Sequence, residues 1–445
     1  MDIAGLETTF DRLVAALLEN QGSGEHLKLS LIGEQSQFTR FNQAKVRQTG
    51  SVSDGELNLT LMRDQRTAFQ DFPFTGDWET DWQQAQAALS ELRQEVSQLP
   101  EDPYLVLPEG EATSREVYSG NLLPPEAVAD AALPAVKGLD FTGFYAAGSL
   151  IRAYADSAGQ KHWFATETFT LDYSLFTDDG QAVKDTFAGD HWDQQAYANK
   201  LDQSKRQLAQ LAQPPKAVPK GQYRTYLAPA AVAELLNMFS WGAVSEASLQ
   251  RGGSALGLLQ RQEKQFSPKF HLSENFQHGL VPRFNDWGEI APMQLPIIQA
   301  GKLVNTLVNS RTAKEYGKTA NGANGRESLR SPEIAPGDLA GAEIFAALDT
   351  GLYVSNLHYL NWSDRPSGRV TGMTRYACFW VEAGKIVAPI QNLRFDESLY
   401  RCFGENLIAL TDFQEFMPEV GSYGHRSLGG SWVPGALIEG FTYTL

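Results

Sequence analysis

The densest group of polar side chains suited to molecular recognition lies in residues 281–328. A turn at Asn285 opens this stretch, and a loop near its end carries Asn321, Asn324 and Arg326. Carboxamides donate and accept hydrogen bonds, and a guanidinium can bind a carboxylate or a carbonyl through two parallel N–H groups. These side chains therefore suit the binding of a peptide. The alternative is that Asn and Gly only form tight turns, because both tolerate a left-handed backbone.

Apolar segments of strand length connect the turn to the loop. One strand is predicted to end at Ile297-Ile298, and a turn is predicted at Ala300-Gly301. A second apolar run passes through Leu303 and Val308 before the Asn/Gly-rich loop begins. The polar side chains are thus predicted to project from loops at the ends of short strands.

Three segments in the second half of the chain carry a resemblance to a known family. The first has a strand, a proline and a long helix, and the second is the turn, strand and loop described above. The third has a strand, a Glu-x-Gly-x-Ile hairpin and an Asn-x-Arg-Phe segment. Together they resemble the C-terminal domain of the TldD/PmbA metallopeptidases and of their partner subunits. The segments are Tyr223–Leu256, Val281–Ser328 and Ser367–Phe403.

The resemblance has a gap at the catalytic motif. Catalytic members of that family carry His-Glu-x-x-x-His on a helix, where two imidazoles share a zinc ion and the Glu acts on its water. The corresponding positions here are Asn237, Met238 and Gly242, and no cysteine follows Cys402 to act as a third ligand. The resemblance therefore implies no catalytic residue and no metal ligand in this chain, which is similar to the PmbA/TldE side of the family.

The resemblance also selects a set of peptide-binding candidates. Residues 371–375 read Thr-Gly-Met-Thr-Arg, which resembles a PmbA-like subgroup and adds one arginine to the set. A competing interpretation is that Arg326 pairs with Asp286 or Glu289 and only holds the loop. The predicted peptide-binding residues are Asn285, Asn321, Asn324, Arg326 and Arg375.

The resemblance implies a PmbA/TldE-like subunit of a cytoplasmic metallopeptidase that acts on unfolded peptides. This chain is then expected to be non-catalytic and without a cofactor, while a TldD-like partner in a heterodimer carries the zinc. The alternative is a homodimeric peptide-binding or modulator protein without proteolysis, an idea attached to the family through DNA gyrase modulation. A neighbouring gene that encodes His-Glu-x-x-x-His on the equivalent helix favours the first interpretation.

Composition narrows the class of partner and the compartment. The net charge is -16, which disfavours nucleic acid and anionic membranes as partners because both are repelled by an acidic surface. Two cysteines cannot form a disulfide framework, which is typical of a reducing compartment. The first residues carry acidic side chains where a signal peptide needs positive charge and an apolar run. We therefore expect a cytoplasmic protein without a membrane span.

Length and one proline-rich segment predict two domains. The chain has 445 residues, more than one hydrophobic core usually serves. Residues 212–221 contain three prolines, which favours a linker. We predict an α+β domain of antiparallel strands and helices over residues 1–211. A mainly β domain with one long helix is predicted over residues 222–445.

Apolar periodicity places the elements of both domains. Helical spacing predicts helices near residues 5–20, 82–99 and 197–208, and the long helix of the second domain at Ala230–Phe239. Alternating leucines predict strands at His26–Leu31 and Leu57–Leu61. Two further strands between residues 150 and 176 should flank a turn at Ser157–Gly159.

Other catalytic chemistries have weaker support. Gly317-Lys318-Thr319 lacks the glycine five residues earlier that a P-loop needs, and no Gly-x-Ser-x-Gly surrounds Ser174 or Ser254. No two histidines stand three or four positions apart, as helix-borne metal ligands do. The histidines are His26, His162, His191, His271, His278, His358 and His425.

The purified chain is expected to hold no stoichiometric zinc. Asn237 and Gly242 stand where the ligands belong, and a carboxamide and a bare backbone bind zinc far more weakly than two imidazoles. Elemental analysis before and after zinc addition and desalting checks this expectation. One tightly held zinc per chain would contradict it.

Overall fold

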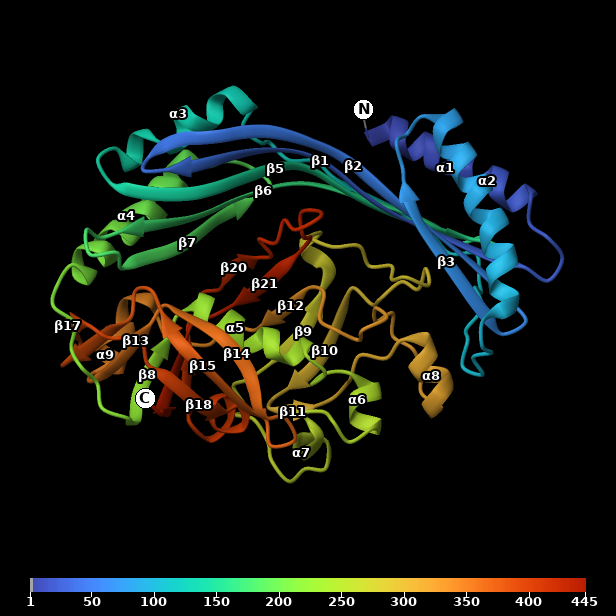
Figure 1. The fold of residues 1–445 in the computed structure, drawn as a ribbon. Coiled ribbons are helices and arrows are strands. Elements are labelled where there is room, and N and C mark those ends of the chain that lie inside the picture. The colour runs from blue at the N-terminus through green and yellow to red at the C-terminus, as the bar shows by residue number, and fades with distance from the viewer. Residues whose placement is uncertain (1–2) are drawn as a thin grey trace.

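A computed structural model describes residues 3–445, so the first two positions of the domain predicted over residues 1–211 lie outside the described part. A long curved sheet from the first half of the chain arches over a second body built from the remainder (Figure 1). The described chain is α+β with mainly antiparallel sheets, which confirms the predicted fold class.

The arching sheet contains seven strands in the described chain, in the order β3-β2-β1-β5-β6-β4, with β7 also pairing with β6. All its pairings are antiparallel except that of β4 with β6. The strands are β1 His26–Asn42, β2 Lys45–Arg63, β3 Arg66–Pro73, β4 Thr113–Tyr118, β5 Asp140–Asp156, β6 Lys161–Phe176 and β7 Ala182–Gly189.

The first strand is much longer than its sequence pattern predicted. Alternation predicted a strand over His26–Leu31, but β1 continues to Asn42. Residues 33–37 read Gly-Glu-Gln-Ser-Gln and have no apolar alternation. They remain extended because β2 and β5 pair with them from both sides, so the hydrogen bonds of the neighbouring strands replace the missing sequence signal.

Helices cover the sheet at its two ends. α1 (Ile3–Glu19) and α2 (Trp78–Glu95) lie on the outer face at one end, where they bury the odd-numbered leucines of β1 and β2 (Figure 1). α4 (Gln194–Leu211) packs at the other end, together with the short α3 (Val128–Ala132). The three longer helices match those predicted near residues 5–20, 82–99 and 197–208.

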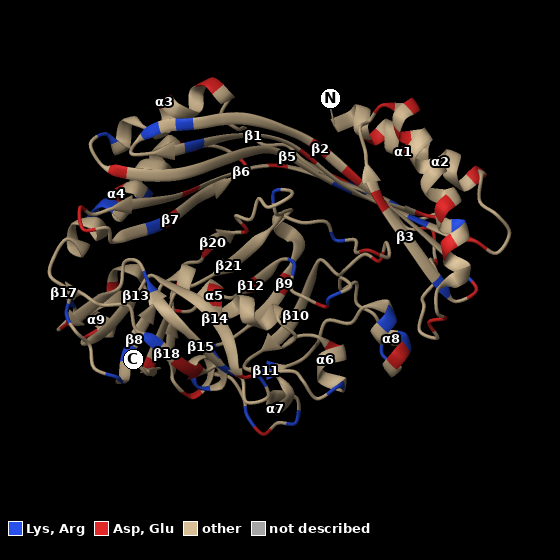
Figure 2. Cartoon of the chain, in the orientation of Figure 1, with Lys and Arg blue, Asp and Glu red and all other residues tan. Residues whose placement is uncertain are grey.

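The acidic surplus of the chain lies partly on this outer layer. Figure 2 shows more acidic than basic residues on α1 and α2, away from the inner face of the sheet. Asp77 caps the first turn of α2 by accepting a hydrogen bond from the backbone N–H of Thr80. Acidic residues in that turn also face the positive end of the helix dipole.

The second body packs two sheets around one helix. The nine-stranded sheet of the described chain has the order β14-β15-β18-β22-β8-β13-β16-β17, with β19 beside β22, and the six-stranded sheet has the order β11-β10-β9-β12-β21-β20. α5 (Pro229–Ser240) contacts strands of both sheets and buries Leu235, Leu236 and Phe239 in the shared core. It is the long helix predicted at Ala230–Phe239.

The remaining elements are short. The strands of the second body are β8 Gly221–Leu227, β9 Leu272–Asn275, β10 Gln294–Gln299, β11 Lys302–Leu303, β12 Pro332–Ile334, β13 Gly351–Val354, β14 Asn356–Asp364, β15 Arg369–Arg375, β16 Phe379–Glu382, β17 Lys385–Pro389, β18 Arg394–Ser398, β19 Leu407–Leu410, β20 Glu415–Pro418, β21 Gly430–Val433 and β22 Ala436–Tyr443. The other helices are α6 Glu246–Gln250, α7 Gly257–Gln260, α8 Ser310–Tyr316 and α9 Ile344–Leu348.

No strand pairing among the described residues joins a strand before residue 190 to one after residue 220. The exact domain limits at residues 211 and 222 stay a prediction. None of the helices in the described part of the chain combines the length and the apolar character needed to cross a bilayer.

Arg426 anchors the second body to the inner face of the arching sheet. Its side chain is only 6% exposed, and its guanidinium donates hydrogen bonds to Ser36 Oγ (3.2 Å), to the Gly148 carbonyl (3.4 Å) and to Thr168 (3.1 and 3.2 Å). Its backbone N–H donates to the buried carboxylate of Glu34 at 2.8 Å. A buried cation is tolerated only with such a set of acceptors, so this contact fixes where the two bodies meet.

Replacement of Arg426 by Ala is expected to lower the free energy of unfolding by about 2–4 kcal/mol, because buried acceptors lose their donor. Guanidinium denaturation measures the change. Arg394→Ala is the matched control, since Arg394 is exposed and its side chain has no polar partner within residues 3–445. The control should change stability by less than about 0.5 kcal/mol, and equal losses in both variants would contradict the anchor.

Candidate functional site

The turn at Asn285 is held by its own side chain. Asn285 Oδ1 accepts hydrogen bonds from the backbone N–H groups of Trp287 (2.9 Å) and Glu289 (3.0 Å). Its Nδ2 donates to the Glu289 carboxylate (2.8 Å) and to the Ala323 carbonyl (2.7 Å). Asn285 is buried, and it therefore joins the turn to the Asn/Gly-rich loop.

The two loop asparagines also bind backbone groups of the chain. Asn321 Nδ2 donates to the Thr306 carbonyl at 2.7 Å, and its Oδ1 accepts from the Val308 N–H at 2.9 Å. Asn324 Oδ1 accepts from the N–H groups of Arg326 (3.2 Å) and Ser328 (3.1 Å). These amides shape the loop, and their contact with a peptide stays a prediction.

Glu327 fixes the loop on the side of α6. Its side chain is 2% exposed, and its carboxylate accepts hydrogen bonds from Ser245 Oγ (2.6 Å), from the Ala247 N–H (3.0 Å) and from the Asn309 N–H (3.0 Å). Glu327 has a φ of 52°, which is unfavourable for a residue with a Cβ. The three contacts at the start of α6 and α8 hold this conformation.

Arg330 fixes the loop on the other side. Its guanidinium donates to the carbonyls of Pro282 (3.2 Å), Arg283 (3.3 Å), Phe284 (3.0 Å) and Gly322 (2.8 Å). The first three carbonyls belong to the segment before the Asn285 turn, and the fourth belongs to the loop. Burial lowers the pKa of Arg330, and the nearby Glu274 carboxylate opposes that shift. One half-buried side chain therefore holds the turn and the loop together.

Arg326 projects from this anchored loop without a partner of its own. Across residues 3–445, its guanidinium has no hydrogen-bond or ion-pair partner, and the side chain is exposed. The alternative pairing with Asp286 or Glu289 is absent in this arrangement. Glu289 instead accepts hydrogen bonds from Asn285 and from Ser310 Oγ.

The loop and the inner face of the arching sheet enclose a cavity of about 380 Å³. Asn285, Asn324 and Arg326 line it from the loop side, and Ser30 and Arg152 line it from β1 and β5. The structure thus brings three of the five predicted residues into one cavity.

The electrostatics of this cavity favour a ligand that is a hydrogen-bond acceptor or an anion. Burial lowers the pKa of Arg152 to about 10, and the Glu34 carboxylate partly opposes this effect. Arg152 stays protonated at neutral pH, so its charge adds to those of Arg326 and Arg330 on the cavity walls. Asp286 is the acidic residue of the lining. A peptide carbonyl or a terminal carboxylate matches this surplus of donors.

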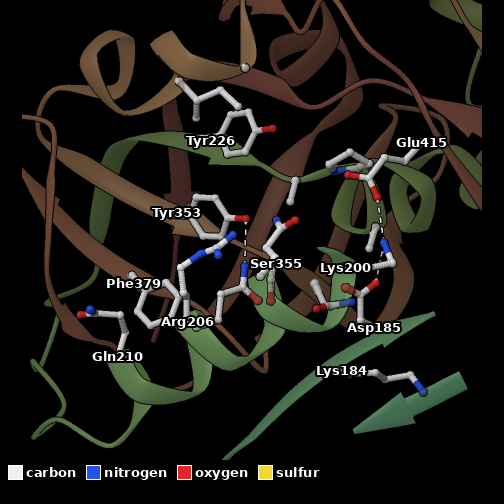
Figure 3. A pocket seen from close by; sticks show the side chains of 18 of the residues that line it. Lys184, Asp185, Lys200, Arg206, Gln210, Tyr226, Tyr353, Ser355, Phe379 and Glu415 are labelled. Carbon is white, nitrogen blue, oxygen red and sulfur yellow. Dashed lines mark hydrogen bonds and ion pairs between the residues drawn. The ribbon is translucent and has the colours of Figure 1, made fainter. Parts of the chain in front are cut away.

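Arg375 does not join this group. It ends β15, where its guanidinium lies 5.4 Å from the ring centre of Tyr376, and it is not among the residues that line the cavity. Its carbonyl accepts a hydrogen bond from Ser355 Oγ at 3.4 Å. Ser355 lines a second, larger cavity between the two bodies (Figure 3).

The three positions that correspond to the zinc motif do not lie together in the structure. Asn237 is exposed on α5, Met238 points into the core with 2% exposure, and Gly242 lies beyond the end of α5 with a φ of 83°. Glu234 lies about one turn before Asn237 on the same face.

No cluster of three or more His, Cys, Asp or Glu in residues 3–445 is arranged to hold a metal ion. The absence of metal ligands in this chain stays a prediction.

Sequence reasoning missed Arg330, Glu327 and Arg152. Arg330 follows Arg326 by four positions, but its four carbonyl partners come from loops 8 to 48 residues away. Glu327 lies between the polar residues Arg326 and Ser328, and no local pattern marks it as buried. Arg152 reaches the cavity only because the sheet folds over the second body.

Comparisons with known proteins identify the family and the fold. The family description "PmbA/TldA metallopeptidase C-terminal domain" matches residues 220–444. No curated protein sequence gives a significant match. The fold is similar to that of TldE from Thermococcus kodakarensis, with a TM-score of 0.81 and 14% identity over 98% of this chain and 100% of that one.

Two structures described as proposed modulators of DNA gyrase share the same fold. The protein from Thermotoga maritima has a TM-score of 0.77 and 15% identity, over 98% of this chain and 100% of that one. The protein from Bacteroides thetaiotaomicron has a TM-score of 0.75 and 17% identity, over 98% of each chain.

Replacement of Arg330 by Ala is expected to free both loops, because four carbonyls lose one shared donor. Hydrogen–deuterium exchange should then speed up at least tenfold in peptides that cover residues 281–291 and 320–328. Arg330→Lys should restore only part of the protection, since an ammonium cannot reproduce the planar fork. Arg326→Ala, four residues away, is the matched control and should leave exchange unchanged. Unchanged exchange in Arg330→Ala would contradict the proposed anchor.

Proposed function

The chain belongs to the TldD/PmbA family of metallopeptidases, and we propose that it serves as a TldE-like subunit that binds peptide without carrying zinc. In this proposal, a TldD-like partner in the cytoplasm holds the zinc, and the two chains together act on unfolded peptides. The role of this chain in the complex is to bind and orient the peptide.

One observation carries the non-catalytic assignment: α5 ends at Ser240, before the position of the second imidazole. Gly242 follows the helix in a left-handed turn, so it lies outside the helix that would have to carry both ligands. The position of the general base holds Met238, whose side chain packs in the hydrophobic core. The local backbone therefore supports a role other than zinc hydrolysis.

The anchored loop supports the peptide-binding part. Glu327 and Arg330 fix the loop that carries Arg326, so its guanidinium can bind an acceptor without first ordering the loop. Backbone carbonyls and terminal carboxylates occur in every unfolded peptide, whatever its sequence. A guanidinium facing them suits an enzyme subunit with broad substrate tolerance.

The partner's zinc would supply the activated water that attacks the scissile carbonyl. In this chain, Arg326 would hold a carbonyl or carboxylate away from the reacting bond, while Arg152 keeps that end of the cavity positive. This division of tasks explains how a subunit without the motif can contribute to turnover.

Arg326→Ala is expected to lower peptide turnover by the assembled complex about tenfold or more, because a charge-assisted contact worth ~1.5–3 kcal/mol is lost. The melting temperature should stay nearly unchanged, since the side chain has no partner in the described chain. The assay uses the chain mixed with a zinc-bearing TldD-like subunit and an unfolded peptide substrate.

Controls separate this role from a structural one. Arg394→Ala removes another exposed arginine and should leave turnover unchanged, and Met238→Glu should not give the isolated chain activity. A sharp fall in stability with unchanged peptide affinity would favour a purely structural Arg326. Chelator-sensitive proteolysis by this chain alone would overturn the proposal. Peptide binding by a homodimer that never supports cleavage would favour the modulator alternative instead.

A further inference from the structure

The larger cavity between the two bodies has a volume of about 750 Å³, a size typical of small-molecule sites. α4 and β7 of the arching sheet line one side, and β8, β13, β20 and α9 line the other. Figure 3 shows Arg206, Tyr353 and Phe379 at one end of the cavity, with Lys200 between Asp185 and Glu415 at the other end. The proposed peptide contact at Arg326 does not use this cavity.

The acidic side chains of this cavity are already paired. Lys200 Nζ lies 2.9 Å from Asp185 Oδ1 and 3.2 Å from Glu415 Oε2. The two carboxylates raise the pKa of Lys200 despite its burial, while burial raises the pKa of Asp185. Both carboxylates of this lining therefore already contact the Lys200 ammonium.

Aromatic rings form much of the remaining wall. The ring centre of Tyr353 lies 5.4 Å from that of Tyr226, 5.7 Å from that of Phe345 and 6.1 Å from that of Phe379. Gln207 Nε2 donates to the Tyr353 hydroxyl at 3.3 Å, which fixes that ring. Such a wall favours a flat, apolar group, because edge-to-face and stacked contacts add to the area buried.

Arg206 carries a charge of this cavity that has no partner in the described chain. It lines the cavity from α4, is exposed to solvent, and has no polar partner within residues 3–445. An unpaired guanidinium beside an aromatic wall favours a ligand in which an anionic group lies next to an aromatic ring.

We propose that this cavity binds molecules that join an aromatic ring to a free carboxylate, with the ring against Tyr353 and the carboxylate at Arg206. Free aromatic amino acids and short peptides that end in Phe or Tyr share this chemistry. A ligand there would contact α4 and the second body at once, so its binding would also stabilise their contact. The inference stands apart from the peptidase role, because the isolated chain suffices to test it.

The test is isothermal titration calorimetry of the isolated chain with phenylalanine, with acetyl-Ala-Ala-Phe and with its C-terminal amide. The free acids should bind with a Kd below 1 mM, and the amide should bind at least fivefold more weakly. Tighter binding of the tripeptide than of phenylalanine would identify a peptide as the source of the ring and carboxylate, and the reverse order would identify the free amino acid. No binding of either acid, or equal binding of acid and amide, would overturn the proposal.

Two variants locate the site. Arg206→Gln should weaken binding of the free acid at least fivefold and abolish the difference between acid and amide. Lys205→Gln removes a neighbouring charge on α4 that does not line the cavity, and it should leave binding unchanged. Ala209→Trp, at an exposed position of the lining, should block binding with an unchanged melting temperature. Equal effects of Arg206→Gln and Lys205→Gln, or normal binding by Ala209→Trp, would place the ligand elsewhere.

Discussion

The burial of Arg426 against the inner face of the arching sheet is the contact on which the rest of the arrangement depends. A guanidinium taken out of water needs several acceptors, and here they come from three different strands of the sheet. Gly148, whose carbonyl accepts from Arg426, has a φ of 144° and lies so close to the Gln35 backbone that there is no room for a Cβ. Both cavities are lined by residues of the two bodies, so both depend on this contact.

The same physical rule shapes the loop beside the smaller cavity. Arg330 is half-buried and satisfied by four carbonyls, and Glu327 is buried and satisfied by one hydroxyl and two N–H groups. Each charge is expensive to bury alone, so each fixes the backbone segments that supply its partners. Arg326 directly precedes Glu327 in the chain and is the member of this group that faces solvent. Rigid neighbours and one unpaired guanidinium are what a recognition contact requires.

Local charge in the two cavities is opposite to the charge of the whole chain. The net charge is -16, yet Arg152 and Arg326 face one cavity and Arg206 faces the other. The acidic surplus lies in part on the outer helices, where water and salt screen it. A carboxylate or a carbonyl inside either cavity therefore responds mainly to the near guanidinium groups, and the negative surface disfavours polyanions such as nucleic acids.

The sequence alone determined the elements that depend on local periodicity: α1, α2, α4, α5 and the turn at Asn285 all follow spacing or turn chemistry that neighbouring residues carry. It also grouped Asn285, Asn324 and Arg326, because they share one segment. Tertiary structure decided the rest. Arg152 and Arg330 act through partners distant in the sequence, β1 extends where only its neighbours hold it, and Arg375 lies apart from the loop. Local patterns cannot show these features, since long-range hydrogen bonds and the docking of two bodies create them.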